Sequence, residues 1–84
     1  MKTLKNLEEM KNKSCEPFGN QYDYFFARLE DYYISKLDGL DRINAELQNW
    51  DDESKLIIVN KLIEIISKSG IIGFNKNELL SLIK

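Results

Sequence analysis

The residues that most often carry out chemistry in proteins are scarce in this sequence. The 84-residue chain contains no histidine and a single cysteine, Cys15. Histidine is the commonest general base and metal ligand, and zinc sites are built mainly from cysteine and histidine. Without a histidine partner, Cys15 is expected to be an unreactive loop thiol rather than a nucleophile. The sequence therefore predicts no catalytic residue, no metal site and no cofactor.

Carboxylates are the remaining candidates for chemistry. The chain has 14 acidic residues, which cluster most densely at Glu8-Glu9 and at Asp51-Asp52-Glu53. Each cluster has a structural explanation, because the first suits a solvated helix face and the second supplies an N-cap and favourable charge at a helix start. The sequence has no glycine-rich phosphate-binding motif. We therefore expect a protein that is not an enzyme.

One group of residues has the composition of a protein-binding surface. On a helix that turns its apolar stripe to the core, Tyr24 points almost directly away from that stripe, on the same side as Asp31 and Asp38. An exposed tyrosine among carboxylates is typical of a hot spot for a basic protein partner. The predicted partner-binding residues are Tyr24, Asp31, Tyr32, Ile34 and Asp38. The alternative is a solvated helix face that carries one stray tyrosine.

The triplet Asp31-Tyr32-Tyr33 is similar to a binding element in colicin-nuclease immunity proteins. The sequence around it does not match those proteins, so the triplet assigns no family. The frequent use of Lys, Asn and Ile, with Lys well above Arg, indicates an AT-rich source such as a phage or a mobile bacterial element. Small acidic helical proteins from such sources are often inhibitors or immunity proteins. The leading prediction is a non-enzymatic protein of this type that binds a basic partner protein.

The elements that position these residues are organised around one segment. Between Leu56 and Ile66, eight of eleven residues are large aliphatics. On a helix they cover about half of the circumference, so other elements must pack on more than one side. This segment is therefore the predicted core helix, which Asp51 or Asp52 is expected to cap and Gly70 to end.

The preceding segment predicts one long helix over about residues 21–49. Its apolar residues keep a heptad register from Phe26 to Trp50. Gly39 leaves an alternative, in which one helix ends there and Asp41 caps a second. A break gives no reason for the register to persist, and one interior glycine costs only about 1 kcal/mol. A single helix bent at Gly39 is therefore favoured.

Short helices are expected at both ends of the chain. Thr3 is a suitable cap for the first. Residues 13–20 concentrate helix breakers and predict a loop, in which Phe18 anchors to the core. Asn75 opens a capping-box-like pattern that predicts a last helix over residues 76–83. The expected fold is an all-α small helical bundle, built on a long-helix/core-helix hairpin with short terminal helices.

Composition predicts a single soluble domain over residues 1–84. Hydrophobic residues make up 43% and charged residues 31%, as in ordinary globular proteins. The net charge of −2 provides no basic surface for nucleic acid or an anionic membrane. No apolar run approaches the length of a membrane span or of a signal-peptide core. Together with the single cysteine, these features predict a cytoplasmic location.

Ile57 suggests a second class of function. It falls on the polar side of the core helix, so either the N-terminal helix or another subunit is expected to cover it. The runner-up hypothesis is a homo-oligomeric structural or regulatory subunit, with a homodimer expected. A helix-turn-helix interpretation of residues 65–82 is disfavoured, because its reading helix offers only Lys76, Asn77 and Lys84 to DNA.

Overall fold

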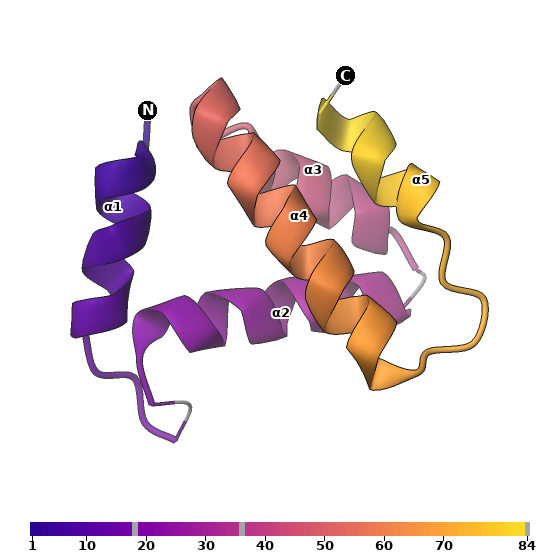
Figure 1. Cartoon of the computed structure of the whole chain (residues 1–84), viewed down its shortest axis with the longest axis horizontal. Coiled ribbons are helices and arrows are strands. Elements are labelled where there is room, and N and C mark those ends of the chain that lie inside the picture. The colour runs from indigo at the N-terminus through magenta and orange to yellow at the C-terminus, as the bar shows by residue number, and fades with distance from the viewer. Residues whose placement is uncertain (18, 36, 84) are drawn as a thin grey trace.

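The computed structural model of the chain describes residues 1–17, 19–35 and 37–83 and is shown in Figure 1. It is 73% helical and has five α-helices and no strand in this part of the chain, which confirms the predicted all-α bundle. The helices are α1 (Leu4–Glu9), α2 (Gln21–Ser35), α3 (Gly39–Leu47), α4 (Asp52–Ser69) and α5 (Lys76–Leu80). Short 3-10 turns follow α1 and α5, at Met10–Asn12 and Ser81–Ile83.

Helix α4 forms the centre of the core, as its apolar arc predicts. It runs across α2 and contacts α1 and α5 as well (Figure 1). Its fully buried aliphatic side chains are Ile58, Val59, Leu62 and Ile66. The helix begins after Asp51, whose carboxylate accepts a hydrogen bond of 2.9 Å from the backbone N–H of Ser54. It ends at Gly70, which adopts a left-handed φ of 72°.

The predicted single helix over residues 21–49 is wrong, because the chain forms α2 and α3 with a break between them. Asp38 has a left-handed φ of 48°, which no continuous right-handed helix accommodates. Gly39 then lies against the backbone of Tyr32, where a Cβ atom on residue 39 would overlap the Tyr32 carbonyl oxygen. Gly39 is therefore a point of close approach between two helices rather than a bend within one.

The heptad register survives the break because both helices face the same core. Phe26 and Leu29 in α2 are buried together with Ile43 and Leu47 in α3. Since α2 and α3 also pack on each other, the apolar residues of α3 enter the same core as those of α2. The long arm of the predicted hairpin is thus two helices folded against one another.

The N-terminal segment is fixed to the connection between α3 and α4. Lys2 donates a backbone hydrogen bond of 2.8 Å to Asn49 and accepts one of 2.9 Å from Asp51. Leu7 in α1 is 2% exposed and belongs to the core. Phe18, the expected loop anchor, lies outside the described residues.

The C-terminal segment returns to the bundle as the sequence predicts. The side chain of Asn75 caps α5 by accepting a hydrogen bond of 3.0 Å from the backbone N–H of Asn77. Leu79 is fully buried in the core. Within the described residues, the helices are all too short or too polar to span a membrane.

Candidate functional site

Two tyrosines and two arginines stack on the surface of α2 and α3. The guanidinium carbon of Arg28 lies 5.7 Å from the ring centroid of Tyr24 and 5.9 Å from that of Tyr32. These residues are four apart on α2, a spacing that places side chains side by side on a helix. Arg42 reaches over from α3, and its guanidinium carbon lies 5.7 Å from the Tyr32 ring centroid. We refer to these four residues as the tyrosine–arginine ladder.

The ladder holds its aromatic rings in a defined arrangement. Arg28 Nη2 donates a hydrogen bond of 3.4 Å to the Tyr32 hydroxyl, and this bond raises the pKa of Arg28 above its ordinary value, while burial acts in the opposite direction. A guanidinium stacks on aromatic faces, and each such contact is worth about 0.5–1 kcal/mol at an exposed site. The ladder contains both arginines of the chain, whose other basic residues are lysines. Tyr24 and Tyr32 are both half-buried.

Tyr24 and Arg28 also line a groove of about 380 Å³ between α1 and α2. Lys2 and Lys13 are on its walls, but Glu9 and Glu46 are there too. This groove therefore carries both signs of charge and favours no particular class of ligand.

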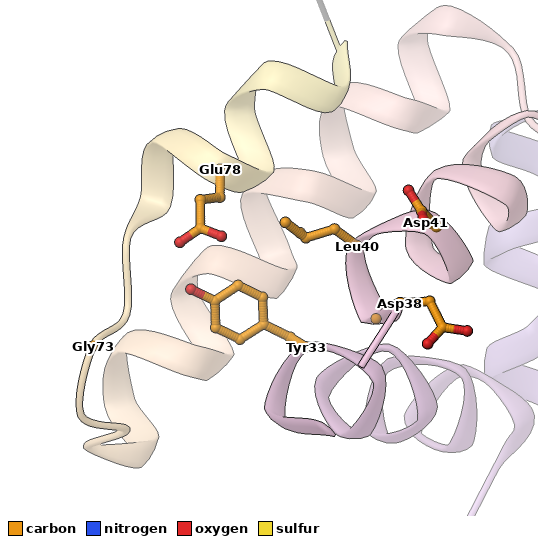
Figure 2. A pocket seen from close by; sticks show the side chains of 7 residues that line it. Tyr33, Asp38, Leu40, Asp41, Gly73 and Glu78 are labelled. Carbon is orange, nitrogen blue, oxygen red and sulfur yellow. The ribbon is translucent and has the colours of Figure 1, made fainter. Parts of the chain in front are cut away.

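Asp38 connects the ladder to a pocket of about 300 Å³ (Figure 2). One of its carboxylate oxygens lies 3.9 Å from Nε of Arg42. An exposed ion pair of this kind contributes at most about 1 kcal/mol, so its importance here is that it joins two surface features. We refer to this cavity as the acidic pocket. Its lining residues are Tyr33, Asp38, Gly39, Leu40, Asp41, Gly73 and Glu78.

The acidic pocket is built where α2, α3 and α5 meet. The Tyr33 hydroxyl accepts a hydrogen bond of 3.1 Å from the backbone N–H of Asn75, and the Tyr33 ring packs edge-on against Phe74 at 5.8 Å. These contacts fix the α4–α5 connection on the end of α2. Figure 2 shows Glu78 of α5 across the pocket from Asp41 of α3. Among the described residues, the lining contains three carboxylates and no basic side chain.

Three exposed hydrophobic residues lie next in sequence to residues that line the acidic pocket. Ile34 is 46% exposed, Leu37 79% and Ile72 92%. Each of the three is the immediate chain neighbour of a residue that lines the pocket.

The structure divides the predicted partner-binding residues between these two features. Tyr24 and Tyr32 belong to the ladder, Asp38 lines the acidic pocket, and Ile34 is exposed on α2 directly after the lining residue Tyr33. Asp31 is exposed on α2, directly before Tyr32. The candidate site is therefore a surface made by α2, α3 and the α4–α5 connection. Ile57, the predicted self-association residue, lies apart from it on α4.

Several residues of this surface were not predicted from the sequence. Arg28 has a local signal, because it lies four residues from both Tyr24 and Tyr32. Arg42 and Glu78 have none, because they reach the site only through the break between α2 and α3 and the return of α5.

The described residues contain no group of three or more His, Cys, Asp or Glu side chains that could hold a metal ion. In comparisons with protein-family models, curated proteins and solved structures, nothing matches the chain. The function must therefore be argued from the chemistry of the surface.

Proposed function

We propose that this chain is a non-enzymatic protein-binding protein of the inhibitor or immunity type, which uses the candidate site to bind a basic partner protein. The observation that carries the proposal is the tyrosine–arginine ladder. Tyrosine and arginine are enriched among the residues that dominate interface energies. Because stacking already restricts these side chains, less conformational entropy is lost when a partner covers them.

The charge around the ladder supports a basic partner. The segment from Gln21 to Leu47 has six acidic and three basic residues, whereas the rest of the chain is nearly balanced. Both arginines of the segment already have neighbours, since Arg28 and Arg42 stack on tyrosines and Arg42 also pairs with Asp38. Asp31 is exposed on this face, and the net negative charge of the segment would steer a basic protein towards it.

The proposal is tested by one substitution in the ladder and one directly beside it. Tyr24→Ala is expected to speed dissociation of the partner, because a packed hot-spot side chain mainly holds the formed complex together. Asp31→Asn is expected to slow association and to weaken its dependence on salt, because a rim charge acts mainly through steering. The partner is captured from a lysate of the source organism, identified by mass spectrometry and then measured by surface plasmon resonance.

Asn60→Ala is the matched control, because Asn60 is exposed on α4 and lies outside the candidate site. Tyr24→Ala removes the stacking contact with Arg28, which at an exposed site is worth about 0.5–1 kcal/mol, and is expected to leave the protein folded. If Tyr24→Ala unfolds the protein, Tyr24 acts as a structural residue and the proposal is wrong. Folded Tyr24→Ala and Asp31→Asn variants that bind as well as the wild type would also contradict it.

A second candidate function is a homo-oligomeric structural or regulatory subunit. It is favoured by Leu56 and Ile57 on α4, which are 50% and 40% exposed. Under this hypothesis a homodimer buries the two side chains, and Ile57→Lys should dissociate it. Sedimentation equilibrium at micromolar concentrations is then expected to give twice the 9.9 kDa mass of the chain. A single species of 9.9 kDa would rule this candidate out.

A further inference from the structure

We infer that Arg28 is a positioning residue of the candidate site, which holds the ring of Tyr24 in place before the partner protein binds. This inference rests on the proposed function and adds to it how the hot-spot tyrosine is prepared for binding. Arginine at a protein interface commonly contacts the partner itself. Arg28 acts instead within its own chain, through the tyrosines on either side of it on α2.

Tyr32 is the fixed end of this arrangement. Its side chain is half-buried and packs against the hydrophobic core. Arg42 of α3 covers its ring at 5.7 Å, and Gly39 of the same helix lies against its backbone. Tyr32 is therefore held by the core and by a second helix, so it offers a stable support for a neighbouring side chain.

Arg28 is placed on this support by two contacts. Its Nη2 donates a long hydrogen bond of 3.4 Å to the Tyr32 hydroxyl, and its guanidinium carbon lies 5.9 Å from the Tyr32 ring centroid. None of the ion pairs among the described residues includes Arg28. The hydrogen bond to Tyr32 also raises the pKa of Arg28 more than the nearby charge of Glu46 does. The position of Arg28 is therefore set mainly by Tyr32.

Tyr24 lies on the other side of Arg28. The guanidinium carbon is 5.7 Å from its ring centroid, within the range of about 6 Å in which a cation and an aromatic ring attract each other. Arginine suits this place because its planar guanidinium can stack on rings and also donate a directed hydrogen bond, unlike the compact ammonium of lysine. A tyrosine held in this way loses less conformational freedom when a partner covers it.

The experiment measures the order of the tyrosine side chains in the isotope-labelled free chain by nuclear magnetic resonance relaxation. In the wild type, the order parameter of the Tyr24 side chain should be near the value of a rigid backbone, about 0.85, and in Arg28→Met it should fall below about 0.6. Methionine keeps an unbranched apolar stem and removes the guanidinium. Tyr32→Phe, which keeps the ring and removes the hydrogen-bond acceptor, should give Tyr24 an intermediate value.

Arg42→Met is the matched control. Arg42 also stacks on Tyr32 but belongs to α3, so its loss should leave Tyr24 ordered. Tyr33 is 6% exposed and accepts a hydrogen bond from the backbone N–H of Asn75, so it should stay ordered in every variant that keeps the fold. Should Arg28→Met loosen Tyr33 as well, the conclusion is drawn from Tyr32→Phe, in which Tyr24 must then lose order.

Binding measurements with the partner from the capture experiment separate positioning from direct contact. Arg28→Met should weaken binding about threefold to tenfold, as expected when one or two side chains must be ordered on binding. In a chain that already carries Tyr24→Ala, the same change should have almost no further effect, because the ring to be positioned is gone. An arginine that touched the partner itself would cause the same loss in either background.

The inference is overturned if Tyr24 is as ordered in Arg28→Met as in the wild type, or if the loss of binding is undiminished in the Tyr24→Ala background. These outcomes are separate from those of the proposed function. Partner binding that depends on Tyr24, in a chain whose Tyr24 order does not depend on Arg28, would keep the proposed function and remove this inference. Loss of Tyr24 order in Arg28→Met, in a chain whose partner ignores Tyr24→Ala, would show the positioning and remove the proposed function.

Discussion

Replacing Leu62 with alanine is expected to lower the free energy of unfolding by about 2–5 kcal/mol. Leu62 is fully buried near the middle of α4, the helix that runs across α2 (Figure 1). Removing most of its side chain loses apolar burial and leaves a cavity that helices packed on several sides cannot close. Denaturation by guanidinium chloride, followed by circular dichroism, measures the change.

The control for this prediction lies two residues away on the same helix. Asn60 is exposed, so Asn60→Ala is expected to change stability by no more than about 0.5 kcal/mol. A loss below about 1 kcal/mol for Leu62→Ala would mean that α4 is not the centre of the core. Since small domains are stable by only about 5–15 kcal/mol, the expected loss is a large share of the total.

Helix α4 could be predicted from the sequence because all of its determinants are local. The density of aliphatic residues between Leu56 and Ile66 requires burial on several sides, whatever elements supply the cover. Asp51 and Gly70 specify its ends through the chemistry of their own positions, as an acceptor for a free N–H and as a residue tolerant of a left-handed φ. The structure has both caps where they were expected.

The break between α2 and α3 could not be predicted in the same way. A heptad stripe is compatible with one long helix and with two helices that face the same core, so periodicity does not distinguish them. What decides the case is a tertiary contact, the approach of Gly39 to the Tyr32 backbone. Helix propensity includes only the small local cost of a glycine, and it does not include contacts with residues outside the helix.

In the candidate site, too, one part could be predicted from local spacing, whereas the other part depends on a tertiary contact. Tyr24 and Arg28 are neighbours through helix geometry alone, so the α2 part of the ladder follows from spacing. The acidic pocket depends on Tyr33 meeting Asn75, 42 residues further along the chain. No local pattern reports such a contact, which is why Glu78 was not predicted as a site residue.

Replacing Gly39 with alanine is expected to destabilise the protein by about 1–3 kcal/mol or more, as overpacking of a close contact does. The added Cβ would overlap the carbonyl oxygen and carbon of Tyr32, which are backbone atoms and cannot rotate away. In a single continuous helix the same change would instead stabilise the chain by about 1 kcal/mol. Thermal and chemical denaturation therefore distinguish the two architectures by the sign of the effect.

Gly70 provides the matched comparison because it needs glycine for a different reason. Its φ is 72° and nothing lies within 4 Å of the position that a Cβ would occupy. Gly70→Ala is expected to cost about 1–2 kcal/mol through the left-handed backbone, and asparagine, which tolerates that conformation, should recover part of the loss. At Gly39 asparagine should be no better than alanine, because the obstacle is the Tyr32 backbone.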